Sequence, residues 1–305
     1  MKVKSLLALV AIASLSLSSC NLDTDEDNNY MTGTYSCCNL VIPEDGNAFA
    51  TIASYSMTYY YTAGTASLAT TNLSLGYGTL GFETNSMNIN TKYYAVDGKQ
   101  VDVTSFSGGS ATNNGTLVQN VNGYVSSIVN MLGTNDPINP LYKFTARIPI
   151  VVSYNVNYDY TVKTFQPDAI YTGVTNIQTV GSGAAPFTND GIRYRVYLSA
   201  DLKKADIIFY NAKFASAMPV TINFVLQGLD VTYNKNGYVI SGENITPSLY
   251  EADGLTPAPN YVFTKFEFLN TSDDLTVGNA FYTVKIGEAQ YNGDFQGAYT
   301  YSSKE

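Results

Sequence analysis

The chain has 305 residues, with 25 Asp and Glu against 16 Lys and Arg, and a formal net charge of −9. It contains no histidine, which excludes His-based catalytic triads and most catalytic zinc sites and removes the usual general base near neutral pH. The negative charge argues against nucleic-acid binding, because phosphates would be repelled. Only 13% of the residues are charged, so the surface must be rich in Thr, Ser, Asn and Tyr, which suits an extracellular β-protein.

The first residues have the features of a secretory signal. Lys2 and Lys4 precede an apolar run over residues 6–17. This run is shorter than the roughly 20 apolar residues that a membrane-spanning helix needs. A charged start followed by such a run is typical of a signal that is removed from the mature chain.

The apolar run ends in Leu17-Ser18-Ser19-Cys20. A branched apolar residue, two small residues and a cysteine, placed directly after a signal-like segment, resemble the lipobox of bacterial lipoproteins. The resemblance implies that residues 1–19 are a signal peptide, that the chain is cut before Cys20, and that this cysteine is acylated. The alternative is an ordinary signal cut that leaves Cys20 as a thiol. Each buried CH₂ of an acyl chain contributes about 0.8 kcal/mol to membrane binding, so several chains anchor a protein firmly.

Residues 20–29 are expected to form an acidic tether outside the fold. Four acids occupy five positions: Asp23, Asp25, Glu26 and Asp27. The run resembles the export tag that follows the lipidated cysteine in surface lipoproteins of Bacteroides-type bacteria. This resemblance implies attachment to the outer membrane, facing the cell exterior; the alternative is a solvated tether with no signal role.

The same acids also match the first ligand spacings of an EF-hand loop. Asn28, however, stands where the loop needs glycine, and Thr34 stands where it needs glutamate. We therefore expect no calcium site here, and no other metal or cofactor motif is evident in the sequence.

A duplication organises the rest of the chain. Without residues 1–19 the protein has 286 residues and a net charge of −11, a length that fits about two domains. Four short segments recur in the same order, at offsets of 114, 119, 122 and 120 residues. The paired segments are 122–125 with 236–239, 140–145 with 259–264, 160–163 with 282–285, and 171–173 with 291–293. They predict two domains related by internal duplication, over residues 30–169 and 170–305.

Strands can be recognised by alternation of apolar and polar residues with period two. Residues 154–163, 192–198 and 220–226 follow this pattern. Asp97-Gly98 and Asn236-Gly237 predict hairpin turns, since such pairs supply the positive φ that tight turns require. The segment 124–132 is the one stretch that could form two helical turns. We predict an all-β protein of two tandem antiparallel domains, each a calycin-like barrel or a β-sandwich.

Cys37 and Cys38 are adjacent, so in a strand they point to opposite faces. We expect two small side chains with at least one thiol reduced; the alternative is a strained disulfide between them.

The C-terminal half resembles a family of calycin-like β-barrel lipoproteins from Bacteroides-type bacteria. The resemblance is carried by residues 213–247, by YVFTKFEF over 261–268 and by YNGDFQGAY over 291–299. It implies a barrel, and it contains no catalytic motif.

Catalytic signatures are lacking in the sequence. No P-loop, dinucleotide-binding, nucleophile-elbow or C-x-x-C pattern is present, and no spacing singles out two carboxylates for glycoside hydrolysis. Tyr59, Tyr60 and Tyr61 form the densest aromatic cluster and are candidates for stacking on a sugar, although at least one of them should lie in the core.

We therefore expect a membrane-anchored surface lipoprotein that is not an enzyme and binds a glycan or another extracellular ligand, such as a surface protein. The alternative is a structural or adhesive component, because fimbrial subunits of the same bacteria resemble this chain in being lipoprotein precursors with two β-domains. Their basic cleavage site is missing here, since no Lys or Arg lies between Cys20 and Lys92.

Overall fold

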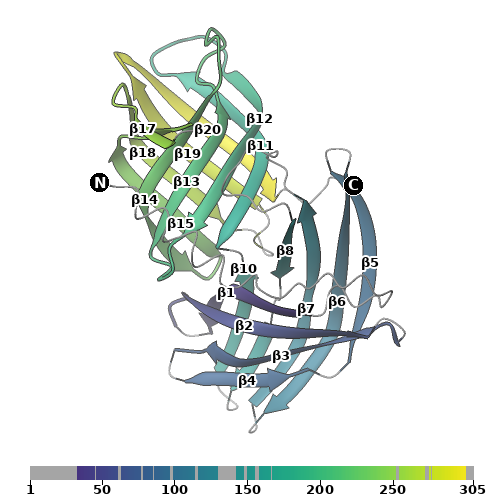
Figure 1. Ribbon diagram of the computed structural model, residues 1–305. Coiled ribbons are helices and arrows are strands. Elements are labelled where there is room, and N and C mark those ends of the chain that lie inside the picture. The colour runs from purple at the N-terminus through teal and green to yellow at the C-terminus, as the bar shows by residue number, and fades with distance from the viewer. Residues whose placement is uncertain are drawn as a thin grey trace. The chain divides into compact units, whose positions relative to one another are not determined.

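The computed structural model describes residues 33–44, 46–60, 63–76, 78–84, 86–96, 99–113, 116–129, 142–147, 150–154, 158–165, 167–251, 254–271, 275 and 277–299. Every secondary-structure element in these ranges is a β-strand (Figure 1), which confirms the all-β prediction. The chain divides into two compact units, Met1–Gln166 and Pro167–Lys304. The division lies just before the predicted border between residues 169 and 170, which falls inside a strand.

Unit 1 is a curled half-barrel sheet (Figure 1). Its strands are β1 (Gly33–Pro43), β2 (Phe49–Tyr60), β3 (Thr65–Ser74), β4 (Thr79–Glu83), β5 (Met87–Val96), β6 (Lys99–Asn113), β7 (Thr116–Val129), β8 (Tyr142–Arg147), β9 (Ile150–Tyr154) and β10 (Tyr158–Phe165). Their order is β2-β1-β10-β9-β7-β6-β5-β3-β4, with β8 beside β7 and β2 also paired with β3. The pairing of β3 with β5 spans only Thr65↔Asn88 and Ala66↔Met87.

The described core of unit 1 is mainly apolar and contains a buried polar pair. Tyr55 is fully buried and donates a hydrogen bond of 2.6 Å to Oδ1 of the buried Asn39. Cys37 and Cys38 are both buried and are not joined by a disulfide. Burial, with a smaller effect from Cys37, raises the pKa of the Cys38 thiol well above its usual value, so Cys38 stays protonated.

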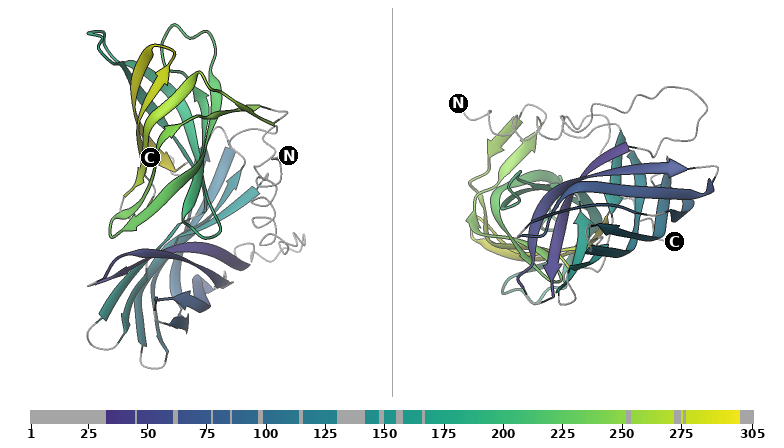
Figure 2. Two further views of the ribbon diagram at one scale, coloured as in Figure 1. Left: turned by 90° about the vertical axis from the view of Figure 1, so that its left-hand side faces the viewer. Right: turned by 90° about the horizontal axis from the view of Figure 1, so that it is seen from below.

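Unit 2 is a closed eight-stranded antiparallel barrel (Figure 2). Its strands are β11 (Asp168–Thr179), β12 (Phe187–Leu198), β13 (Lys204–Ala212), β14 (Ile222–Asn234), β15 (Gly237–Ile245), β16 (Ser248–Glu251), β17 (Gly254–Pro257), β18 (Tyr261–Asn270), β19 (Val277–Ile286) and β20 (Ala289–Tyr299). The ring runs β13-β12-β11-β20-β19-β18-β15-β14 and closes because β14 also pairs with β13. The short hairpin of β16 and β17 pairs with β14 outside the ring. For this unit the structure selects the barrel over the sandwich.

Aromatic rings fill the inside of the barrel. Along β12 the inward residues 192, 194, 196 and 198 are buried, as the alternation predicts. Tyr194 stacks on Phe295 with ring centroids 4.0 Å apart and contacts Phe209 at 4.3 Å. Eight strands enclose a space that side chains can just fill, and these rings occupy it.

The polar groups inside the barrel fall into two sets. In the first, Asn270 donates from Nδ2 to the Tyr171 hydroxyl and to the Leu275 carbonyl, the latter at 3.0 Å. In the second, the buried Tyr194 hydroxyl interacts with the hydroxyls of Thr175 and Tyr282, although none of the three makes a hydrogen bond of full geometry among the described residues. Burial raises the pKa of Tyr194 and of Tyr282, with smaller effects of each on the other, so both phenols stay neutral.

The predicted hairpins form, but one has a different turn. The pair β5 and β6 is a hairpin with Val96 opposite Lys99, and residues 97–98 lie outside the described residues. In the pair β14 and β15, Asn234 stands opposite Gly237, so residues 235–236 make the turn. Asn234 Oδ1 accepts from the backbone N–H of Asn236 at 2.8 Å and fixes this turn without positive φ at residues 236 or 237. Gly237 is needed for another reason, because a Cβ there would lie 1.8 Å from the Asn270 carbonyl oxygen.

Two other local predictions are wrong. Residues 124–129 belong to β7 and are not helical, and residues 130–132 of the same predicted segment lie outside the described residues. The alternating segment 154–163 is two antiparallel strands, β9 and β10, with Tyr158 opposite Tyr154. The period-two alternation continues in the sequence between the two strands, so the boundary between them could not be recognised from the pattern.

The internal duplication remains a prediction. Segment 122–125 lies within β7, whereas its match 236–239 begins at a turn. Segments 171–173 and 291–293 lie on β11 and β20, which are neighbouring strands of the same barrel.

We expect Gly173→Ala to destabilise the barrel. A Cβ at this position would lie 1.9 Å from the Gln296 backbone oxygen and 2.5 Å from the Gly297 Cα. Because backbone atoms cannot give way easily, we expect a loss of about 3 kcal/mol in the free energy of unfolding, measured by urea denaturation. Gly183→Ala is the matched control, since a Cβ there meets nothing within 4 Å. Equal midpoints for the two variants would contradict the close approach of β11 and β20.

Two Tyr→Phe variants should separate the polar sets of the interior. Tyr171→Phe removes one acceptor of the Asn270 amide, which keeps the Leu275 carbonyl at 3.0 Å and the Tyr238 hydroxyl at 3.2 Å, and we expect it to lower the free energy of unfolding by about 1 kcal/mol. Tyr194→Phe removes a hydroxyl that contacts those of Thr175 and Tyr282 without full hydrogen-bond geometry, so we expect a change below about 0.5 kcal/mol. A similar loss for both variants would mean that the Tyr194 hydroxyl is hydrogen-bonded in the folded protein, to one of these neighbours or to a buried water.

Candidate functional site

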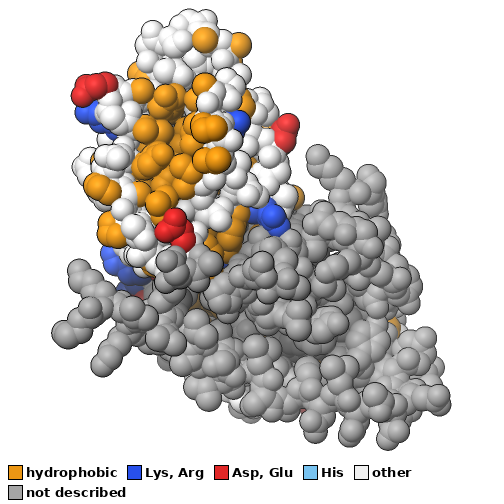
Figure 3. Space-filling view, turned by 45° about the horizontal axis from the view of Figure 1, so that its top comes forward, with side chains coloured by type: hydrophobic (Ala, Val, Ile, Leu, Met, Phe, Trp, Pro, Cys, Tyr) orange, Lys and Arg blue, Asp and Glu red, His pale blue; other side chains and the backbone are white. Residues whose placement is uncertain are grey.

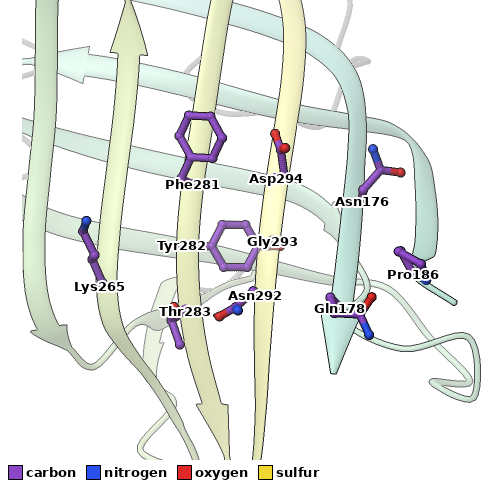
Figure 4. Close-up of a pocket in the computed structure, with 10 residues that line it drawn as sticks. All are labelled: Asn176, Gln178, Pro186, Lys265, Phe281, Tyr282, Thr283, Asn292, Gly293 and Asp294. Carbon is purple, nitrogen blue, oxygen red and sulfur yellow. Dashed lines mark hydrogen bonds between the residues drawn. The ribbon is translucent and has the colours of Figure 1, made fainter. Parts of the chain in front are cut away.

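A groove lies on the outer face of the barrel in unit 2 (Figure 4). Its volume is about 410 Å³, within the roughly 300–1,000 Å³ typical of ligand pockets. It crosses β18, β19, β20 and β11 and reaches the loop before β12. Its lining residues are Asn176, Gln178, Pro186, Lys265, Phe281, Tyr282, Thr283, Asn292, Gly293 and Asp294.

Strand alternation determines which side chains face the groove. On β19 the inward residues 280, 282 and 284 are buried, so Phe281 and Thr283 point outward. Tyr282 stands opposite Gly293, and a Cβ at that glycine would lie 2.1 Å from the Tyr282 ring. The glycine therefore makes room for the inward tyrosine at the point where the groove crosses from β19 to β20.

Strand register arranges the outward side chains in two rows. One row runs Phe281, Asp294, Asn176, each directly opposite the next on the neighbouring strand. The other runs Lys265, Thr283, Asn292, Gln178 in the same way. Neighbouring strands are about 4.8 Å apart, so the longer row extends over roughly 14 Å.

Two asparagine amides in the groove are oriented by threonine hydroxyls. Thr188 donates to Asn176 Oδ1 at 3.0 Å. The Thr283 hydroxyl bonds to Asn292 Oδ1 at 2.9 Å. Because both amide oxygens accept these bonds, the Nδ2 groups are the ends that remain as donors for a ligand.

The rim formed by the loop between β11 and β12 is held in place. Gln178 donates from Nε2 to the carbonyl oxygens of Ala184 at 3.0 Å and Ser182 at 3.3 Å. Val180 donates to the Gln290 carbonyl at 2.8 Å, which ties the start of the loop to β20. The groove is therefore bordered by an ordered loop that carries Pro186 to its edge (Figure 4).

Charge in the groove is sparse. One carboxylate oxygen of Asp294 is shielded from water and has no hydrogen-bond partner among the described residues. Lys265 lies 3.3 Å from Glu267, and both side chains are substantially exposed. On the face of unit 2 seen in Figure 3, uncharged polar and hydrophobic atoms predominate over charged ones.

The groove contains none of the residues singled out from the sequence. Cys20, Asp23, Asp25, Glu26, Asp27 and Tyr61 all lie outside the described residues. Tyr60 is 50% exposed at the end of β2 in unit 1, and Tyr59 lies in the same strand, with its side chain outside the described part. Alternation in the sequence could have identified Phe281, Asn292 and Asp294 as outward-facing residues of their strands. It could not have shown that the two strands are neighbours and bring these side chains together.

Other chemistry is limited within the ranges the structure describes. These residues contain no group of three or more Cys, Asp or Glu arranged to hold a metal ion, and no helix suited to crossing a membrane. Asp168 is held in a two-point ion pair by the buried Arg195, with both distances 2.9 Å. Two parallel hydrogen bonds between an arginine and a carboxylate hold both side chains in a fixed geometry, as in a structural ion pair.

No protein-family model matches the chain. No curated protein matches its sequence. Among solved structures, a candidate outer membrane protein from Bacteroides fragilis aligns over 88% of this chain and 97% of its own, with 12% identity and a TM-score of 0.32. A double mutant of Transferrin Binding Protein B from Haemophilus parasuis aligns over 89% of this chain and 77% of its own, with 7% identity and a TM-score of 0.26. The chain is a distant structural match to both.

Proposed function

We propose that this protein is a lipoprotein of the outer membrane, anchored through Cys20, that binds a glycan or another polar extracellular ligand without catalysis. The observation that carries the binding role is the groove on unit 2, where two oriented amides and a carboxylate lie beside an exposed aromatic ring. The anchor and its exterior orientation rest on the motif over residues 17–20 and on the acids that follow it.

A binding role without turnover is supported by the groove's composition. Its lining has a single carboxylate, Asp294, whereas hydrolysis of a glycosidic bond usually needs two. The chain has no histidine to act as a general base. The lining is instead mostly amide, hydroxyl and aromatic, which suits recognition by hydrogen bonds and contact with a ring.

The anchor can be tested by fractionation. We expect Cys20→Ala to leave the protein soluble or unprocessed, because no thiol remains to be acylated. The control is Ser19→Ala, which keeps a small residue before the cysteine and should stay with membranes. Full partitioning of Cys20→Ala with membranes would show that another feature holds the protein there.

The groove can be tested by blocking it. The purified full chain is applied to an array of extracellular polysaccharides and matrix proteins. Asn292→Trp places a bulky ring among the lining residues and is expected to abolish retention. Val277→Trp, on an exposed position of β19 outside the groove, is expected to leave retention unchanged. Retention of the Asn292→Trp protein at the level of the wild type would refute the groove as the binding site.

A further inference from the structure

We infer that the groove takes a neutral saccharide, with the apolar face of a sugar ring on Phe281 and adjacent hydroxyls on Asp294, Asn176 and Asn292. This inference rests on the proposed binding role of the same groove and specifies its ligand class.

The polar groups complement a pair of neighbouring hydroxyls. Each sugar hydroxyl is at once a donor and an acceptor, so it can donate to a carboxylate while accepting from an amide. Asn176 and Asp294 are direct cross-strand partners, which places their Cβ atoms about 5 Å apart. Asn292 is two residues from Asp294 on β20, about 7 Å along the strand. One acceptor thus lies between two donors, within the span of one sugar ring.

The aromatic surface lies next to these groups. Phe281 is 43% exposed and stands directly opposite Asp294, on the side away from Asn176. An exposed phenylalanine beside polar groups matches a ligand with an apolar face and a polar edge, as a sugar ring has. Along the row Phe281, Asp294, Asn176, which crosses three strands, the surface changes from apolar to polar, as a sugar ring does from its face to its edge (Figure 4).

Charge favours a neutral saccharide over a charged ligand. An anionic sugar would meet the Asp294 carboxylate, and Glu267, 3.3 Å from Lys265, offsets part of the charge of that lysine. An ammonium ligand would satisfy Asp294 but would have no acceptor for the two amide donors. A pair of hydroxyls can serve the carboxylate and both amides at once.

The experiment compares ligand classes and variants in the purified full chain. The probes are neutral oligosaccharides of glucose, mannose and galactose, an oligomer of uronic acid, and oligolysine, each titrated by calorimetry. We expect binding of at least one neutral series. Asp294→Asn should weaken it at least tenfold, because the negative charge is lost and an amide donor replaces one of the two acceptor oxygens. Phe281→Ala should weaken it about tenfold, whereas Phe281→Tyr should retain it. Val277→Ala, on the same strand outside the groove, should bind as the wild type does, and circular dichroism reports whether each variant is folded.

The outcomes separate this inference from the proposed function. Binding of only the uronic or lysine oligomers, abolished by Asn292→Trp, would overturn the neutral saccharide and leave the groove as a binding site. Neutral binding that Asp294→Asn leaves unchanged would also overturn the inference. Binding that survives Asn292→Trp would overturn both proposals.

Discussion

The barrel of unit 2 depends on the close approach of β11 and β20. Gly173 faces Gly297 across this pair, and the β20 backbone occupies the space that a side chain at residue 173 would need. These are the first and last strands of unit 2 along the chain, and their pairing joins its two ends within a ring that has no open edges, since β13 and β14 also pair. Closure satisfies the backbone groups of both strands and also separates an inside from an outside.

That separation decides where a ligand can bind. The inside is filled by stacked rings such as Tyr194, Phe209 and Phe295, so recognition is left to the outer face. Since side chains alternate along each strand, the inward residues of β19 and β20 fix Phe281 and Asp294 as outward. The alternation that directs apolar side chains into the core therefore also determines which side chains form the two rows of the groove.

The fold class could be predicted from the sequence because alternation is a local property. Residues 192–198 show it clearly, and the structure buries the predicted face. The role of Gly237 could not be predicted, because the contact that requires a glycine comes from Asn270, on a strand formed later in the chain. The groove was missed for the same reason: Asn176 and Asp294 become neighbours only when the ring closes. The anchor residues around Cys20 remain a prediction.

The ordered loop beside the groove has a kinetic consequence. Gln178 holds the backbone of this loop by hydrogen bonds to Ala184 and Ser182, and Val180 fastens it to β20. In the proposed binding mode a ligand would thus meet a loop that is already held in place and would spend little free energy on ordering it. Association would then follow a single kinetic phase, with a rate set by diffusional encounter and orientation. Differences in affinity between ligands would arise mainly from their dissociation rates.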